Sequence, residues 1–196
     1  MCVAILCKAG AIIPETSLRA CFTANPDGAG FAYVHPDTNK IVVKKGYFDF
    51  DKFKKDYYPA AAKYGQQSPF VVHMRIATSG RVDKSNCHPF KVRGGVMAHN
   101  GVMGAGFKEK SDTRVFVELY QNALRRDWVE ANKDKIGSAV GSWNKLVFLF
   151  EDRSFVIINE KAWHWKNGIA YSNTSWEWRE RGTSYNYHGY GRGSDV

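Results

Sequence analysis

Cys2 occupies the position in the chain that most directly suggests covalent chemistry, because only Met1 precedes it. Its side chain is small enough for an initiator methionine to be removed. Removal would leave Cys2 with a free α-amine, whose usual pKa is about 7.7–8.0, beside a thiol with a usual pKa of about 8.5. Such a residue carries its own general base near neutral pH, like other nucleophiles activated by an N-terminal amine. The alternative is a core cysteine at the start of a strand.

The other three cysteines have simpler interpretations. Cys7 and Cys21 lie among apolar neighbours and are predicted to be small core residues, while Cys87 lies in a loop-like segment. No C-x-x-C pair is present. We therefore expect free thiols in a reducing compartment.

Three further segments contain residue types suited to a polar active site. Arg75, at the end of the predicted strand in the segment His73–Gly80, can form two parallel hydrogen bonds to a carboxylate. At Asn100-Gly101, a side-chain amide and a glycine N–H can point together at one oxyanion. Asp112 follows Ser111 at a predicted helix start. Taken singly, these residues are explained by a structural ion pair, a turn and a first-turn helix carboxylate.

Taken together and in this order, the segments resemble the class II glutamine amidotransferases. In that family a processed N-terminal cysteine precedes D-x-A-G-type, H-x-R-x-A-T-x-G, H-P, H-N-G and S-D-T elements. The corresponding segments here are Asp27–Gly30, His73–Gly80, His88-Pro89, His99–Gly101 and Ser111–Thr113. The resemblance covers about residues 2–172, and the order of five elements is more specific than any one of them.

The resemblance also implies a role for each matched residue. Cys2 would attack the side-chain amide of glutamine, form a γ-glutamyl thioester and release ammonia, with its α-amine as general base. Asn100 and the Gly101 N–H would form the oxyanion hole. Among the implied substrate-binding residues, Arg75 would hold the α-carboxylate with Thr78 beside it, and Asp112 would hold the α-ammonium. His88 would lie near the site and organise the neighbouring loop. No metal and no cofactor is expected.

Two positions depart from the family pattern. Val3 stands where the family usually has glycine after the nucleophile, so its methyl groups are expected to narrow the approach to the thiol. Ser79 stands where some members have histidine, so one substrate contact is expected to be missing. Neither change removes a catalytic group.

Three alternative functions have some support in the sequence. His73, Cys87, His88 and His99 include metal-ligand types, but their spacing fits poorly with compact zinc motifs. A different amide substrate is a second alternative, although Arg75 and Asp112 match the two charges of a free amino acid. A catalytically inactive basic protein is the third. The net charge of +9 and the Tyr- and Arg-containing C-terminus suit single-stranded nucleic acid, but no block of like charges is present.

Hydrophobic patterning predicts the elements that would position these residues. Strands grouped in hairpins, with helices between the groups, indicate an α+β fold and not alternating βαβ units. The resemblance implies the four-layer αββα sandwich of the N-terminal nucleophile hydrolases. The predicted strands are Val3–Cys7, Gly30–His35, Lys40–Lys45, Pro69–Ile76, Gly95–Ala98, Lys145–Phe150, Ser154–Ile158, Trp163–Trp165 and Ile169–Tyr171. The predicted helices are Pro14–Phe22, Asp49–Tyr58 (with Pro59 ending or kinking it), Ser111–Leu124 with Ser111 as N-cap, and Asp127–Ile136.

The chain is expected to contain one glutaminase domain, residues 1–175, and a mobile tail rich in aromatic residues and glycine, residues 176–196. No signal peptide and no apolar run of about 20 residues is present, so a cytoplasmic location without membrane association is expected. The ammonia would pass to a ligase or synthase acting in trans. Candidate docking residues are Trp176, Trp178, Tyr185, Tyr187 and Tyr190.

Overall fold

Two antiparallel sheets form the centre of the protein in the computed structural model, which describes residues 1–104 and 107–178. The six-stranded sheet has the order β3-β2-β4-β1-β10-β9, and the four-stranded sheet has the order β5-β6-β7-β8. The strands are β1 Val3–Cys7, β2 Ala29–Val34, β3 Ile41–Tyr47, β4 Phe70–Met74, β5 Phe90–Val92, β6 Gly95–Asn100, β7 Lys145–Phe150, β8 Phe155–Ile158, β9 His164–Lys166 and β10 Ile169–Tyr171. The predicted mixture of helices with antiparallel, hairpin-connected strands is confirmed.

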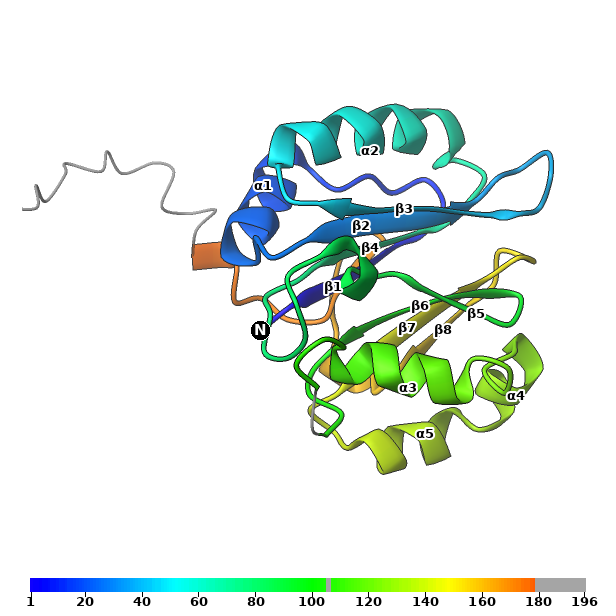
Figure 1. Ribbon diagram of the computed structural model, residues 1–196. Coiled ribbons are helices and arrows are strands. Elements are labelled where there is room, and N and C mark those ends of the chain that lie inside the picture. The colour runs from blue at the N-terminus through cyan, green and yellow to red at the C-terminus, as the bar shows by residue number, and fades with distance from the viewer. Residues whose placement is uncertain (105–106, 179–196) are drawn as a thin grey trace, which may run out of the picture.

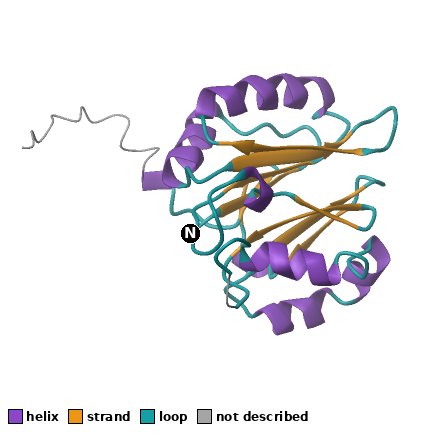
Figure 2. Cartoon of the chain, viewed as in Figure 1, coloured by secondary structure: helices purple, strands orange, loops and turns teal. Residues whose placement is uncertain are grey.

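The helices cover the outer faces of the two sheets (Figures 1 and 2). Helices α1 and α2 lie on the six-stranded sheet, whereas α3, α4 and α5 lie on the four-stranded sheet. Their bounds are α1 Glu15–Ala24, α2 Phe50–Tyr64, α3 Asp112–Tyr120, α4 Arg126–Ala131 and α5 Lys133–Val140, with short 3₁₀ helices at Lys84–Asn86 and Glu160–Ala162. Apolar clusters fill all three spaces between these layers.

The central strand β1 places the N-terminus beside the ends of other strands. It pairs with β4 on one side and β10 on the other, with Val3 opposite Met74 and Ile5 opposite Tyr171. Because β1 and β4 are antiparallel, the residue before β1 meets the residues that follow β4. Cys2 is therefore brought next to the Arg75 segment across 73 residues of sequence.

Three predicted helices differ from the structure, the first of which, Ser111–Leu124, ends at Tyr120 in α3. Helix α2 continues through Pro59 to Tyr64. Proline removes one helical hydrogen bond, and buried Tyr57 and Ala61 on either side still anchor the helix on the sheet. The predicted helix Asp127–Ile136 is two helices, because Asn132 Nδ2 bonds the Trp128 carbonyl at 2.9 Å and so ends α4. The short strand β5 was not predicted.

Trp176 does not lie in an exposed tail, in contrast to the prediction. Trp176 is only 1% exposed, packs on Tyr171 with ring centroids 4.8 Å apart, and donates its indole N–H to the Asn173 carbonyl. It belongs to the core and not to an exposed tail, whereas Trp178 is exposed. The rest of the predicted mobile tail, residues 179–196 with Tyr185, Tyr187 and Tyr190, lies outside the described residues. Within the described ranges, no helix combines the length and apolarity that crossing a membrane would need.

Candidate active site

Cys2 lies directly against the backbone that follows β4. Its Sγ is 3.3 Å from the Ile76 carbonyl and 3.4 Å from the Ile76 N–H. The Cys2 carbonyl accepts a bond from Asn173 Nδ2 at 2.6 Å. Burial raises the pKa of the thiol above its usual value, although the Ile76 bond and the Arg75 charge partly offset this effect. A thiol in this position therefore needs a base to become a nucleophile at neutral pH.

Val3 does not narrow the approach to the thiol, contrary to the expectation from the sequence. Its side chain is fully buried in the apolar cluster between the six-stranded sheet and helices α1 and α2. Ala4 packs in the other cluster, between the two sheets. Since successive side chains of a strand point to opposite faces, Val3 and Cys2 point in opposite directions.

A small pocket brings together most of the residues that the sequence indicated. It is lined by Cys2, Arg75, Ile76, Thr78, Ser79, His88, His99, Gly101, Ser111, Asp112 and Thr113. The Asn100 side chain is 1% exposed and does not line it. The cavity volume is about 20 Å³, enough for about one water molecule.

Arg75 is fixed by the loop that follows it and by the segment before β2. Its guanidinium donates to the Arg81 carbonyl at 3.0 Å and to the Ser79 carbonyl at 2.5 Å, which uses two of its five N–H donors. Its main-chain N–H bonds the Gly28 carbonyl at 2.8 Å, and Asp27 Oδ2 accepts the Ala77 N–H at 2.8 Å. The Asp27–Gly30 segment thus acts as a support for the arginine and its loop.

Asp112 is the first residue of α3, where a carboxylate is stabilised by the helix dipole. Its two oxygens accept the Met103 and Thr113 N–H groups, both at 2.7 Å. The predicted N-cap is confirmed, since Ser111 Oγ accepts the Arg114 N–H at 3.2 Å. The Asp112 N–H in turn reaches Ser79 Oγ at 3.3 Å. The loop that carries Arg75 and the helix that carries Asp112 are therefore joined.

Asn100 and Gly101 lie where β6 ends. Asn100 Nδ2 donates to Ser172 Oγ at 3.0 Å, which leaves its second N–H for another acceptor. Gly101 has φ 148°, and a Cβ there would come within 2.2 Å of Asn144 Oδ1 and 2.9 Å of Asn144 Cα. Only glycine fits this position.

Three buried histidines connect the six-stranded sheet to the four-stranded sheet next to the pocket. His88 Nδ1 accepts the His99 N–H at 3.2 Å, and His73 Nε2 donates to the His99 carbonyl at 2.9 Å. The His73 and His88 rings stack with centroids 3.9 Å apart. Thr113 Oγ1 and Asn144 Oδ1 each lie 2.8 Å from a ring nitrogen of His99. These bonds form a structural hydrogen-bond network. The metal site that the sequence offered as an alternative would have used these histidines as ligands instead.

Burial of these histidines predicts acid sensitivity. It lowers the pKa of His73 to about 3, below its usual 6.5. The folded protein therefore keeps His73 neutral, and stability that is fully present above pH 6.5 is lost as the pH falls toward 3. We expect the free energy of unfolding to fall by about 2 kcal/mol between pH 7 and pH 5 because of this residue. Urea unfolding of His73→Gln should show a smaller pH dependence, whereas exposed His164→Gln should match the wild type. Equal pH slopes in all three proteins would contradict the assignment.

One polar residue that holds the site together, Asn86, was not indicated by the sequence. Asn86 is fully buried. Its Oδ1 accepts the Ser111 N–H at 3.0 Å, and its Nδ2 donates to the carbonyls of Arg81 and Glu109. Gly30, in the D-x-A-G-type segment, supports the site through its lack of a side chain, because a Cβ there would come within 2.2 Å of the His88 carbonyl. Asn86 was visible in the Asn-Cys-His-Pro segment, but its type alone gave no signal of this role.

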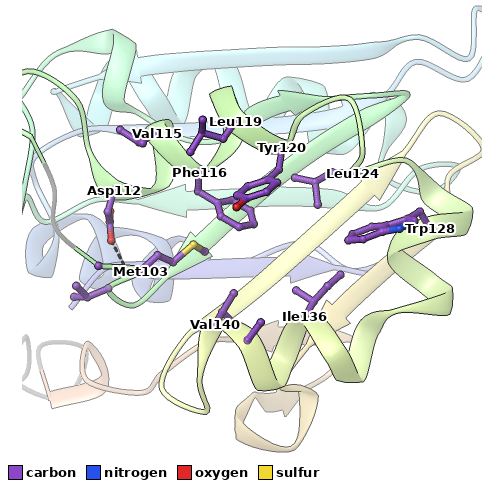
Figure 3. Close-up of a pocket in the computed structure, with 13 residues that line it drawn as sticks. Met103, Asp112, Val115, Phe116, Leu119, Tyr120, Leu124, Trp128, Ile136 and Val140 are labelled. Carbon is purple, nitrogen blue, oxygen red and sulfur yellow. Dashed lines mark hydrogen bonds between the residues drawn. The ribbon is translucent and has the colours of Figure 1, made fainter.

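A larger cavity lies next to the small pocket, between α3, α4 and α5 (Figure 3). Its volume is about 670 Å³, and its lining is mostly apolar, with Phe116, Tyr120 and Trp128 among the side chains. Asp112 lines both cavities. This cavity was not predicted from the sequence.

Comparison with known proteins identifies related sequences. A family model described as class-II glutamine amidotransferases matches residues 19–119. The chain is also similar to the glutamine–fructose-6-phosphate aminotransferase (isomerizing) of Bradyrhizobium diazoefficiens. The two are 29% identical over 106 residues, which cover 45% of this chain and 17% of that protein. This chain thus spans less than a fifth of the relative. The family match includes Arg75, Asn100 and Asp112 but begins after Cys2.

Proposed function

The chain belongs to the class II glutamine amidotransferases, and from this premise we propose that it hydrolyses the side-chain amide of glutamine with Cys2 as nucleophile. The main support is that Cys2, Arg75 and Asp112 line one pocket. A thiol there stands beside one positive and one negative side chain, which match the α-carboxylate and α-ammonium of a free amino acid. Thr78 and His88 line the same pocket and would complete the substrate contacts.

The proposed reaction starts once Met1 has been removed. The α-amine of Cys2 takes the thiol proton, and the sulfur attacks the side-chain carbonyl carbon of glutamine. The Asn100 amide and the Gly101 N–H stabilise the oxyanion that forms. The carbon–nitrogen bond then breaks, and the leaving nitrogen takes the proton back and departs as ammonia. Water cleaves the remaining thioester, which yields glutamate and restores the thiol.

The layered arrangement supports a more specific assignment of the fold. Two facing sheets, each with helices on its outer side, suit the four-layer αββα sandwich of the N-terminal nucleophile hydrolases (Figure 1). We assign the chain to this fold type on the basis of that layering and the place of Cys2 before β1.

A glutaminase of this family releases ammonia for use by a second active site. We propose that the acceptor is an amide-forming ligase or a synthase, reached from the pocket that holds Cys2. The relative matched above is named as an aminotransferase acting with glutamine and fructose 6-phosphate. No feature of the described residues assigns that sugar phosphate to this chain.

The proposal is tested by ammonia release from glutamine at neutral pH, measured together with the intact mass of the purified chain. The mass should show loss of Met1, because a retained methionine blocks the α-amine. Ammonia release from other amides and not from glutamine would favour a different amide substrate. Loss of Met1 without turnover of any amide would favour a binding protein that has lost catalysis.

Arg75→Lys should weaken glutamine binding more than it slows turnover. Lysine keeps the charge but replaces a two-pronged contact with a point charge. It also lacks the donors that hold the Ser79 and Arg81 carbonyls. We expect KM to rise by about 10–100-fold, since a hydrogen bond to a charged group is worth about 1.5–3 kcal/mol. Exposed Arg19→Lys is the control. An unchanged KM with a lowered kcat would exclude a role in binding.

A further inference from the structure

We propose that Ser172, just beyond β10, is a positioning residue that fixes both the start of β1 and the amide of Asn100. This inference rests on the proposed function, because its consequence is measured on glutamine hydrolysis. Ser172 Oγ accepts the Ala4 N–H at 2.9 Å and Asn100 Nδ2 at 3.0 Å. Ala4 is two residues from Cys2, and Asn100 is the proposed oxyanion donor. One buried hydroxyl therefore joins the nucleophile's strand to the group that stabilises the intermediate.

The contact is well suited to orienting the Asn100 amide. Ser172 and Asn100 are 0% and 1% exposed. Asn100 Oδ1 is buried and has no hydrogen-bond partner among the described residues, so the bond to Ser172 is the contact there that fixes the amide plane. With one Nδ2 hydrogen held by Ser172, the other has a defined direction. Without Ser172 the amide would be free to rotate before each turnover.

The residues after Ser172 hold the other side of the nucleophile. Asn173 Nδ2 donates to the Cys2 carbonyl at 2.6 Å, while its Oδ1 accepts the Ser175 N–H at 3.0 Å. Buried Trp176 then closes the turn through its bond to the Asn173 carbonyl. The main-chain pairing of Ser172 with Ala4, from the Ser172 N–H to the Ala4 carbonyl at 2.9 Å, does not use the hydroxyl. Removing the hydroxyl thus leaves the strand pairing in place.

The test compares Ser172→Ala with Ser68→Ala. Ser68, just before β4, is a matched control, because its buried Oγ also accepts an N–H of a strand in the same sheet, that of Val34 in β2, at 2.9 Å. Both variants should lose similar stability in urea unfolding. Only Ser172→Ala should lose kcat, by about 10–100-fold with KM changed less than threefold, because misplacement of a catalytic group costs up to about 100-fold. Ser172→Thr, which keeps a hydroxyl, should retain more kcat than Ser172→Ala.

A double-mutant cycle with Asn100→Ala decides whether Ser172 acts through Asn100. If it does, adding Ser172→Ala to Asn100→Ala should change kcat less than twofold. A full additional loss in that background, equal losses for Ser68→Ala, or a Ser172→Thr variant as impaired as Ser172→Ala would each overturn the proposal.

A measurement without turnover separates this inference from the proposed function. In NMR spectra, the side-chain amide protons of Asn100 should be protected from exchange in the wild type and in Ser68→Ala, and exposed to exchange in Ser172→Ala. If the wild type released no ammonia, the proposed function would fail, and these signals would still show whether Ser172 holds Asn100. Unchanged protection in Ser172→Ala would refute the contact itself.

Discussion

Cys2→Ala should reduce ammonia release from glutamine by roughly 10⁴-fold or more and leave the protein folded. The variant removes the thiol, which is both the nucleophile and the group that the α-amine would deprotonate. The cost to folding should be small, because alanine keeps the Cβ and the thiol makes hydrogen bonds only with the main chain of Ile76 among the contacts of the described residues. Cys2→Ser should also be severely impaired, since a hydroxyl is far less ionised than a thiol near neutral pH.

Labelling of the four cysteines provides the matching control. A glutamine-like diazoketone should modify Cys2 and leave Cys7, Cys21 and Cys87 unmodified, because each of these three is at most 1% exposed. Excess glutamine should protect Cys2 from the reagent. Activity that survives in Cys2→Ala, or a label found mainly on another cysteine, would rule out Cys2 as the nucleophile.

Distant segments meet in the pocket, and the sequence predicted this only because their order along the chain resembles that of a known family. The pattern of the residues predicted a strand at Arg75, which directly follows β4, and a strand before Asn100, which ends β6 two residues later than predicted. It also predicted the helix start at Asp112. It did not give the pairing of those strands. The register that sets Val3 opposite Met74 is a property of the whole sheet, and it is this register that brings Cys2 to Arg75.

The direction of Val3 could not be predicted for a physical reason. A strand with one solvated face alternates between apolar and polar residues, and the alternation shows which side chains share a face. The segment Val3–Cys7 is apolar throughout, because one face packs against the helix side and the other against the second sheet. The alternation along a strand implies that Val3 and Cys2 point to opposite faces. With both faces buried, however, the sequence carries no signal of which face each residue takes.

The residues that hold the site residues in place were harder to predict than the site residues themselves. Asn86, Ser172 and Asn173 act through bonds to main-chain atoms or to other side chains that are far away in the sequence. Buried polar groups need such partners, but the residue type does not identify them. The same holds for Trp176, whose burial depends on a turn that folds back onto Tyr171.

Asn100→Ala should lower kcat by roughly 10²–10³-fold with a smaller effect on KM, because an oxyanion donor acts mainly in the transition state. The structure adds a condition to this expectation, since the amide reaches its place through Ser172 Oγ. Steady-state kinetics on glutamine should be compared with Asn25→Ala. Asn25 is a matched control because it is also buried, its Nδ2 donates to the Cys21 carbonyl, and its Oδ1 has no partner among the described residues.

Asn100→Asp distinguishes loss of a donor from loss of shape. An ionised aspartate has nearly the same volume as asparagine but only accepts hydrogen bonds. Its negative charge would also repel the oxyanion, so its kcat should fall below that of Asn100→Ala. The expected order of kcat is therefore wild type and Asn25→Ala, then Asn100→Ala, then Asn100→Asp. If Asn100→Asp kept more activity than Asn100→Ala, then Asn100 would serve to fill space beside Ser172, and the oxyanion would be held by the Gly101 N–H without it.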